Sequence, residues 1–334
     1  MSNELNNLTF PILRLLADGR FHSGEAIARH FNVTRATVWN AIQQAESLGV
    51  EIFSVLGRGY RLPQPIALLE RERVLGAIGE QRAWFTLELH DHLESTNSHL
   101  MKQAATGAAH ATCVAASLQT KGRGRRGRAW RACLGASLTF SLLWRFQSGA
   151  SALSGLSLAV GVALIRALHG LGVNEAMLKW PNDVIVQRQG HYQKLAGILI
   201  ELQGDMEGPS AAVIGIGINL RLPESMKRSI DQAAIDLESC MREPSDPSLL
   251  LGTLLQHLAA VLNEFERNGF AALREEWRQY HAYHAQQVRL LLPDGREVQA
   301  VASGVAEDGA LLVSTAAGEQ RFMAGEISLR GVEA

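Results

Sequence analysis

The hydrophobic pattern of the first 62 residues predicts three short helices followed by a hairpin. Apolar positions recur at helical spacing, and each of the last two helices is preceded by a residue whose side-chain oxygen is a good N-cap. A glycine-containing turn then separates two short extended segments, as in a β-hairpin. The helices are expected at Phe10–Ala17, Ser23–His30 and Thr34–Leu48, and the hairpin strands at Glu51–Val55 and Tyr60–Leu62.

The third helix has a polar face opposite its apolar one, and the hairpin tip is basic. This order is typical of a winged helix-turn-helix, which places its second capped helix in the major groove and its wing against phosphate. A three-helix module that binds protein fits the same pattern. Trp39 lies on the flank of the polar face, where it contacts either DNA or the core. The residues expected to reach DNA are Arg35, Ala36, Thr37, Asn40, Gln43 and Arg58.

Strands and helices alternate from Ile66 to about Tyr283, which predicts an α+β domain built on a mixed sheet. Short apolar segments separated by turns over Gln286–Arg330 are instead typical of a small all-β barrel. We therefore expect three domains, at residues 1–64, 65–285 and 286–334. The central strands are expected at Trp84–Leu89, Thr112–Leu118, Leu138–Phe146, Met177–Trp180, Val184–Gln187, Leu195–Leu202 and Ala211–Leu220, and the long helices at Ala152–Leu171, Ser248–Arg267 and Phe270–Tyr283.

Composition narrows the function classes. The 334 residues carry 32 basic and 33 acidic side chains, so DNA binding must be local or depend on a dimer. Cys113, Cys133 and Cys240 are odd in number and widely spaced, which fits neither a disulfide framework nor a zinc site and favours a reducing cytoplasm. No secretory signal is present, and the most apolar stretch, Ser151–Ile165, is too short to span a membrane and predicts a buried helix.

The segment Lys121–Arg131, named the arginine loop, holds six positive side chains in eleven residues and matches GxGxxG at Gly122, Gly124 and Gly127. A dinucleotide fingerprint requires a helix immediately afterwards, and no amphipathic helix follows here, so we reject that interpretation. What remains is a flexible loop whose glycines permit close approach and whose arginines bind oxyanions. A solvated loop that binds nucleic acid has the same composition.

Two further segments carry isolated charges at strand ends. In Lys179–Asp183 the proline and the following Asn-Asp predict a turn, at which Asp183 would bind Mg²⁺, hold an amine or merely cap the turn. Lys194 opens the strand of Lys194–Glu201, on the face of Ala196 by the two-residue period. A lysine in that position is usually solvated, and it becomes chemically interesting only if that face lines a pocket.

Gly215, Gly217 and Asn219 share one face of a central strand. Missing side chains weaken a strand unless something packs on the bare backbone, either a flat ligand or a close helix. Earlier in the chain, Ser95, Thr96 and Asn97 precede a helical stretch, so one hydroxyl is an N-cap and the remaining polar groups, with Gln119, are free to bind a small polar head group. The chain contains no Walker P-loop motif.

The segments Gly122–Trp130, Lys179–Asp183, Lys194–Glu201 and Gly215–Asn219, in this order, resemble the biotin protein ligases. With the N-terminal module, the resemblance is to the bifunctional class, which is both biotin operon repressor and biotin-[acetyl-CoA-carboxylase] ligase. It covers essentially the whole chain. It implies a class II synthetase-like catalytic domain, an SH3-like C-terminal barrel and a cytoplasmic enzyme that forms biotinyl-5'-AMP from biotin and ATP with Mg²⁺. Biotin then passes to a lysine of the biotin carboxyl carrier protein.

The resemblance also implies residue roles. The head group of biotin would be bound by Ser95, Thr96, Asn97 and Gln119, and Arg123, Gly124 and Arg125 would close over biotin and the adenylate. Lys194 would contact carboxyl and phosphate oxygens, and Asp183 would orient the acceptor amine and take its proton. The catalytic set is therefore Lys194, Asp183 and Arg125, and the substrate-binding set adds Gly215, Gly217 and Asn219, with no metal ligand assigned among the side chains.

As a repressor, the adenylate-bound chain is expected to form a homodimer that presents two winged helices to operator DNA of the biotin biosynthesis genes, without membrane contact. Two departures from the family bear on this. Ala324 stands where a glycine is common, and residues 221–239, which form an adenylate-covering loop, contain no aromatic side chain. Two alternatives remain, a ligase that no longer binds an operator and a non-enzymatic transcription factor that senses a small acid. A lipoate ligase is disfavoured by the arginine loop.

Overall fold

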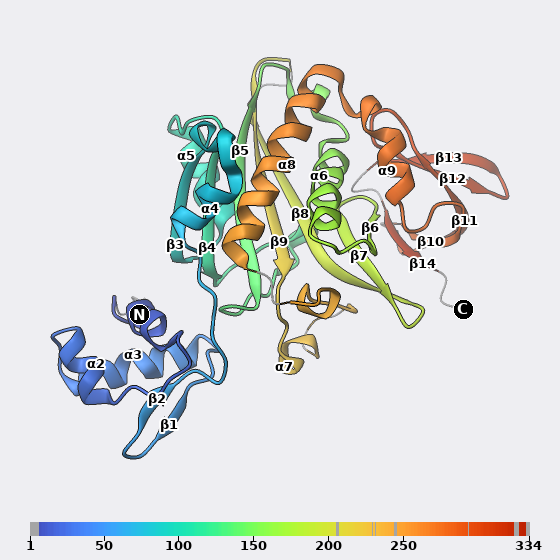
Figure 1. Ribbon diagram of the computed structural model, residues 1–334. Coiled ribbons are helices and arrows are strands. Elements are labelled where there is room, and N and C mark those ends of the chain that lie inside the picture. Colours follow the sequence, from blue (N-terminus) through green and yellow to red (C-terminus); the bar gives the residue numbers. More distant parts are fainter. Residues whose placement is uncertain are drawn as a thin grey trace.

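Three successive units make up the computed structural model, each built on its own sheet (Figure 1). The structure describes residues 7–204, 207–228, 230, 232–243, 246–292, 294–323 and 327–331. The first unit holds three helices and a two-stranded hairpin, the second a seven-stranded sheet with its helices, and the third a five-stranded antiparallel sheet. The predicted three-region organisation is therefore present in the described chain.

The N-terminal unit folds as its capping residues predict. The Ser23 side chain accepts a hydrogen bond from the Ala26 N–H at 3.1 Å, and Thr34 accepts one from Thr37 at 3.2 Å. Trp39 is 55% exposed and lies outside the core of this unit, so its indole belongs to the surface of the third helix. The elements are α1 (Thr9–Leu16), α2 (Gly24–His30), α3 (Arg35–Ser47), β1 (Phe53–Val55) and β2 (Gly59–Arg61).

The central sheet has the strand order β3-β4-β5-β9-β8-β7-β6, in which β3 and β4 are parallel and the other pairs antiparallel. All ten residues of β9 are buried, because the sheet is covered on both faces. The strands are β3 (Thr86–Leu93), β4 (Thr112–Gln119), β5 (Ser137–Phe146), β6 (Ala176–Lys179), β7 (Asp183–Arg188), β8 (His191–Gly204) and β9 (Ser210–Asn219).

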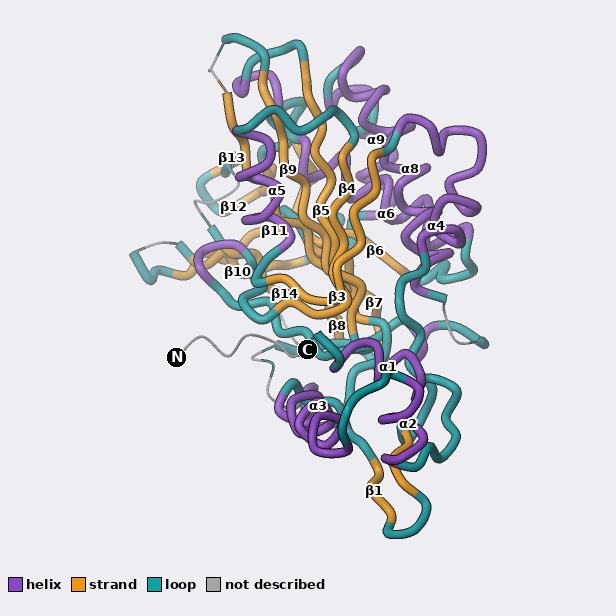
Figure 2. The backbone as a smooth tube through the Cα atoms, turned by 90° about the vertical axis from the view of Figure 1, so that its left-hand side faces the viewer, coloured by secondary structure: helices purple, strands orange, loops and turns teal. Residues whose placement is uncertain are grey.

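Helices cover the two faces unequally. Leu142 packs into the main core with α4, α6 and α8, whereas its neighbour Leu143 packs on the other face with α5. Figure 2 shows α5 on the opposite side of the strands from these three helices. One helix of the described chain, α8, is long and apolar enough to cross a membrane, but most of its apolar stretch is buried in this core. The helices are α4 (Arg71–Ile78), α5 (Thr96–Ala105), α6 (Leu156–Gly170), α7 (Glu224–Lys227), α8 (Pro247–Asn268) and α9 (Arg274–Tyr280).

The C-terminal sheet has the order β13-β12-β11-β10-β14, with every neighbouring pair antiparallel. Its first three connections fall at the glycine-containing pairs Asp294–Gly295, Asp308–Gly309 and Ala317–Gly318, which the sequence pattern marks as turns. The predicted closed barrel is not observed, because β13 and β14 form opposite edges and do not pair with each other within the described residues. The strands are β10 (Gln287–Leu291), β11 (Glu297–Val305), β12 (Leu311–Thr315), β13 (Gly318–Phe322) and β14 (Ser328–Gly331).

Several predicted boundaries were wrong. The helix predicted from Ala152 is broken by Gly155, whose φ of +81° is left-handed, so α6 begins only after it. The helix predicted from Phe270 divides into a 3₁₀ turn and α9. Trp84 ends a 3₁₀ turn instead of starting β3, and α4 was not predicted at all.

The N-terminal unit contacts the central one through a few side chains, whereas the apolar residues of the C-terminal sheet join the main core. Leu118 and Leu134 of the central unit join the core of the N-terminal unit, and Arg14 forms an ion pair with Asp91 of β3. At the other end, the Trp180 indole N–H donates to the Gly309 carbonyl at 3.0 Å. These contacts bring both outer units to the central sheet.

Candidate functional site

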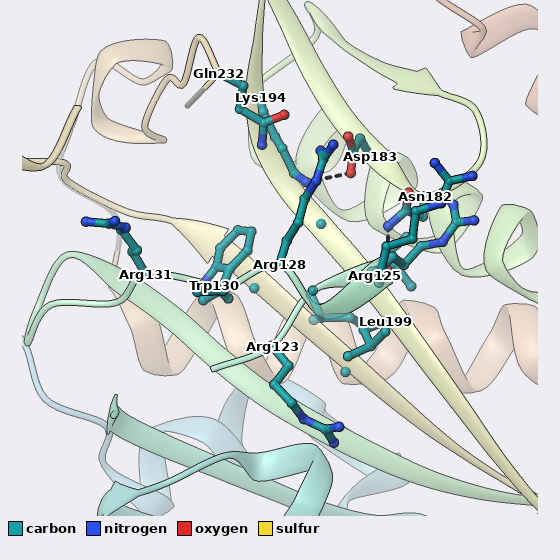
Figure 3. Close-up of a pocket in the computed structure, with 18 of the residues that line it drawn as sticks. Arg123, Arg125, Arg128, Trp130, Arg131, Asn182, Asp183, Lys194, Leu199 and Gln232 are labelled. Carbon is teal, nitrogen blue, oxygen red and sulfur yellow. Dashed lines mark hydrogen bonds and ion pairs between the residues drawn. The ribbon is translucent and has the colours of Figure 1, made fainter. Parts of the chain in front are cut away.

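A cavity of about 430 Å³ lies against the central sheet (Figure 3). It gathers residues from β4, α5, β7, β8, β9, the arginine loop and the C-terminal sheet. The predicted catalytic and substrate-binding residues all line it: Ser95, Thr96, Asn97, Gln119, Arg123, Gly124, Arg125, Asp183, Lys194, Gly215, Gly217 and Asn219. The structure therefore brings together predicted site residues that are up to 124 positions apart in the sequence, from Ser95 to Asn219.

One end of the cavity is a buried network of neutral polar groups. Ser95 is the N-cap of α5, and the Thr96 N–H and hydroxyl both donate to the Gln119 side-chain oxygen, at 2.6 and 3.1 Å. The Ser141 hydroxyl lies 2.7 Å from Thr96 Oγ1 and 2.5 Å from Asn97 Oδ1. All five side chains are at most 9% exposed, and the hydrogen bonds among Thr96, Asn97, Gln119 and Ser141 fix the orientations of these four before any ligand binds.

The bare face of β9 is covered by this chain itself. A Cβ on Gly217 would lie 2.5 Å from the Trp130 ring, and a Cβ on Gly197, its partner on β8, would lie 3.2 Å from it. A Cβ on Gly215 would meet Asn97 Oδ1 at 2.1 Å. At Gly217 the strand is therefore covered by the indole of Trp130, and not by the flat ligand or the helix that was expected, whereas at Gly215 it is covered by Asn97 in the first turn of a helix.

The arginine loop is closed by its own backbone. The Gly124 N–H donates to the Arg128 carbonyl at 2.7 Å, and the Trp130 N–H donates to the Gly122 carbonyl at 2.9 Å. Both bonds enclose a single 3₁₀ turn at Arg125–Gly127. This short turn confirms that no dinucleotide-type helix follows the glycines. The indole thus anchors a hydrogen-bonded loop over the cavity.

An ion pair marks the other end of the cavity. Lys194 Nζ lies 2.7 Å from Asp183 Oδ1, and both side chains are less than one-fifth exposed (Figure 3). The prediction that Lys194 shares a face with Ala196 was wrong. A β-bulge between β7 and β8 shifts the alternation by one residue, so the Lys194 ammonium lies over Gly197 and Ala196 lies in the core.

Lys179 is the partner of Asp183 in the β6–β7 ladder and lines the same cavity. Its pKa is lowered to about 8, chiefly by burial; Asp183 opposes this shift, and the positive charges of Arg330, Lys194 and Arg128 add to it. Burial likewise lowers the pKa of Arg125, whose guanidinium donates to Asn182 Oδ1 at 3.2 Å. This end of the cavity therefore carries a net positive charge, which Asp183 compensates only in part.

The loop arginines point in different directions. Arg128 extends toward the Lys194–Asp183 pair, whereas Arg123 and Arg131 point away from it (Figure 3). Arg123 donates to Ser98 at 3.0 Å and pairs with Glu201 at 3.1 Å. The arginine that extends to the Lys194–Asp183 pair is therefore Arg128 and not Arg123.

The segment after β9 closes a third side. Asn219 lines the cavity, but its amide donates to the carbonyls of Lys194 and Ile235, at 3.1 and 3.0 Å, and so holds this segment against β8. The Lys194 N–H donates to the Ala233 carbonyl at 2.9 Å. In the absence of an aromatic residue here, aliphatic Ile230 and Ala234 line the cavity. Ala324 lies outside the described residues.

Sequence reasoning assigned no role to several lining residues. Ser141 lies behind the lining residues Thr96 and Asn97, and one signal for it was available, because Ser137, Thr139 and Ser141 alternate along β5 and pair with Asn219, Gly217 and Gly215. Other lining residues were quoted only inside motifs, or come from the segment after β9 and from the C-terminal sheet, whose contribution depends on how these segments dock. They include Arg126, Arg128, Trp130, Lys179, Asn182, Ile230, Gln232, Ile327, Leu329 and Arg330.

The predicted DNA-facing residues lie on one module. Arg35, Ala36, Asn40 and Gln43 are exposed along α3. Thr37 is half-buried, and its hydroxyl lies 2.9 Å from that of Thr34, so it contributes to the cap. The exposed Arg58 guanidinium lies over the Phe21 ring at 5.0 Å, at the base of the wing.

Comparison with known proteins agrees with this architecture. Residues 90–219 match the Biotin/lipoate A/B protein ligase family, residues 9–61 an HTH domain and residues 285–330 the Biotin protein ligase C terminal domain. The bifunctional ligase/repressor BirA of Escherichia coli is 35% identical over 98% of this chain and 99% of its own length. The chain belongs to the bifunctional ligase/repressor family.

Other members of this group are more distant. The Bacillus subtilis bifunctional ligase/repressor is 26% identical over 94% of this chain and 95% of its own. The biotin protein ligase of Aquifex aeolicus, solved in complex with biotin and ATP, superimposes with a TM-score of 0.62 at 28% identity, covering 74% of this chain and 99% of that one. Within the family, the central and C-terminal units thus correspond to a solved ligase fold.

The contact between Trp130 and the glycine strand makes a direct prediction. Gly217→Ala places a methyl group inside the indole, and overpacking of this kind costs about 1–3 kcal/mol. We expect trypsin to cleave the arginine loop at least about fivefold faster, measured by limited proteolysis with mass spectrometry. In a Trp130→Ala background, the same glycine substitution should add nothing further. A wild-type cleavage rate in Gly217→Ala would refute the anchoring role.

Proposed function

We propose that this chain is a biotin protein ligase that activates biotin with ATP to biotinyl-5'-AMP and transfers biotin to one lysine of a biotin carboxyl carrier protein. One observation carries the proposal: a buried neutral network and a strongly cationic region share one cavity. Among the described lining residues, eight are basic and only Asp183 is acidic. A neutral ureido head group suits the first end, and a polyphosphate suits the second.

In the first step, a biotin carboxylate oxygen would attack the α-phosphorus of ATP, and the bond to pyrophosphate would break. Negative charge accumulates on the phosphoryl oxygens in that transition state. Arg125, Arg128 and Lys194 are the cations best placed to stabilise it, with Mg²⁺ entering alongside ATP. Their positions are set before the reaction by Asn182, the loop backbone and Asp183, which is what electrostatic catalysis requires.

In the second step, the acceptor amine would attack the acyl carbon of the adenylate, and AMP would leave. The amine must lose a proton as the new bond forms. We assign Asp183 to orienting the amine and accepting this proton, because it is the only carboxylate among the described lining residues. Its ion pair with Lys194 couples the two steps, since the lysine that binds the phosphate oxygens also holds the base in place.

The head group of biotin is assigned to Ser95, Thr96, Asn97 and Gln119. Their mutual hydrogen bonds leave an ordered set of donors and acceptors in a place where unpaired polar groups are costly. Arg123, Gly124 and Arg125 belong to the loop that excludes water from the adenylate. Gly215 and Gly217 admit Asn97 and Trp130, and Asn219 holds the covering segment.

We further propose that the adenylate-bound chain is a homodimeric repressor of biotin biosynthesis genes. The exposed polar face of α3 and the basic wing are a winged helix-turn-helix surface, and Arg35, Ala36, Thr37, Asn40, Gln43 and Arg58 are its proposed DNA contacts. A dimer supplies a second half-site contact that a chain of net charge −1 otherwise lacks. A ligase without operator binding is the second candidate.

The finer architecture is proposed on the same basis. We divide the chain at residues 1–64, 65–285 and 286–334, with a class II synthetase-like central fold and an SH3-like C-terminal unit. The linker between the last residue of β2 and α4 and the turn before β10 support these divisions. A cytoplasmic location without membrane contact fits three free cysteines and the burial of α8.

Ligase activity is tested by incubating the full chain with biotin, ATP, Mg²⁺ and a carrier domain and measuring the carrier's mass. We expect an increase of one biotinyl group per carrier. Lys194→Ala and Arg125→Ala should each slow the reaction by about 10²–10³-fold, because each removes a preorganised cation. The exposed Lys102→Ala variant is the control and should keep the wild-type rate. An unmodified carrier refutes the ligase, and an unchanged rate in both site variants refutes the assigned site.

Lys179 predicts a pH dependence. Because its pKa in the folded chain is about 8, well below that of a free lysine, the ammonium loses its proton as the pH rises through 8. We expect kcat/KM for ATP to fall above about pH 8 in the wild type, since this parameter reports the free enzyme. Lys179→Arg keeps its charge, so its profile should be flat there. Superimposable profiles would contradict the prediction.

Operator binding is tested by electrophoretic shift with the promoter of a biotin biosynthesis operon, with and without biotin and ATP. We expect a shift that strengthens when both ligands are present. Asn40→Ala should weaken it by about tenfold or more, as for loss of a base contact. Arg29→Ala, on the exposed surface of α2, is the matched control. No shift in either ligand state refutes the repressor and leaves the ligase standing.

A further inference from the structure

A second cluster of chemically able side chains lies outside the cavity, between β3 and α5. Glu88 and His90 are two residues apart on β3, so they share the face that α5 covers, while Leu87 and Leu89, on either side of Glu88, pack toward the main core. His99 comes from α5. One donor atom from each of these three residues lies within 4.8 Å of the other two.

The distances are unusual for a hydrogen-bonded cluster. Glu88 Oε2 lies 3.6 Å from His90 Nε2 and 3.8 Å from His99 Nε2, beyond hydrogen-bond range in both cases. Both histidine nitrogens are buried, and neither has a hydrogen-bond partner within the described part of the chain. Two imidazole nitrogens thus lie just beyond hydrogen-bonding distance of one carboxylate oxygen. The three atoms, each with a lone pair, surround a common point at which a metal ion could bind.

We propose that Glu88, His90 and His99 form a site for a divalent transition-metal ion of the Zn²⁺ class. Ligands at about 2.0–2.2 Å from tetrahedral zinc are about 3.3–3.6 Å apart, so the two carboxylate–imidazole separations need only small adjustments. Imidazole donors select zinc, cobalt, nickel or copper over Mg²⁺, which prefers oxygen. The site is therefore distinct in chemistry, as well as in place, from the proposed ATP site.

Neighbouring residues support the ligand set. Gln103, one turn beyond His99 on α5, donates through Nε2 to both Glu88 carboxylate oxygens, at 3.0 and 3.3 Å. Such a partner orients a ligating carboxylate without occupying all its lone pairs. The three side chains are each about one-third exposed, so an ion has access from solvent and a water completes the coordination.

The position of the site suggests a structural role. β3 is an edge strand, and α5 carries Ser95, Thr96 and Asn97 at its start, two residues before His99. A metal ion that bridges β3 and α5 would hold α5 in place against the sheet. It would thereby fix the helix that presents Ser95, Thr96 and Asn97 to the cavity. The fold itself does not require the ion, since α5 already packs on the sheet through Leu100 and Ala104.

The proposal is tested by titrating the untagged full chain with Zn²⁺ against a chromophoric chelator. We expect one equivalent to bind, with excess Mg²⁺ failing to compete. His90→Ala and His99→Ala should each weaken binding by more than about 100-fold, and Gln103→Ala by about tenfold, as for an outer partner. His191→Ala, at the exposed first residue of β8, should bind as the wild type does.

A second measurement separates this site from cysteine coordination and from misfolding. Co²⁺ in place of Zn²⁺ should give visible bands without the intense near-ultraviolet absorption of a thiolate ligand. The metal-free variants should melt at the wild-type temperature, while only the wild type and the His191→Ala control gain stability with Zn²⁺. Absence of a bound equivalent, or unchanged affinity in a His90→Ala/His99→Ala double variant, overturns the proposal.

Discussion

The placement of the Trp130 indole against two paired glycines of the central sheet is the contact on which the site depends. Gly217 and Gly197 are paired across β9 and β8, and together they make a flat surface that accepts the ring. The ring in turn fixes the end of the loop whose arginines enter the cavity. Any side chain at Gly217 occupies the space of the indole, so the glycines of the strand and the tryptophan of the loop form a single unit.

The cationic end of the cavity follows from this closure. With the loop seated, Arg125 and Arg128 join Lys179 and Lys194, and the only acid among the described lining residues is Asp183. Burial of like charges is costly, and the lowered pKa values of Lys179 and Arg125 are the expression of that cost. A polyanionic ligand relieves it. Although the net charge of the chain is near zero, the cavity therefore has a strong positive electrostatic field, which suits a phosphate ligand.

Most of the architecture and the composition of the site could be predicted from the sequence. Strand patterning located the seven central strands, and the motifs named residues that all line one cavity. The failures have local causes. A β-bulge reversed the face of Lys194, and a left-handed Gly155 broke a helix that the apolar pattern extends through. Neither the bulge nor the left-handed glycine changes the spacing of apolar residues, so hydrophobic periodicity does not predict either of them.

Other parts depend on contacts between distant segments. The group that covers Gly217 was expected to be a ligand or a helix, and only the folded chain identifies it as Trp130, 87 residues earlier. The positions of Ile327 and Arg330 in the cavity wall follow from docking of the C-terminal sheet against β6, through Trp180 and the Gly309 carbonyl. The open edge of that sheet likewise depends on strand pairing that short apolar segments do not specify.

The central claim is that the loop anchored by Trp130 encloses an adenylate made in this cavity. It is tested most directly by incubating the chain with biotin and ATP labelled at the α-phosphate, without an acceptor, and counting label that remains bound after rapid gel filtration. The account predicts about one equivalent of retained label that requires biotin, and rapid loss of that label from Trp130→Ala. Retention without biotin, equal retention of γ-phosphate label, or equal retention by Trp130→Ala would contradict it.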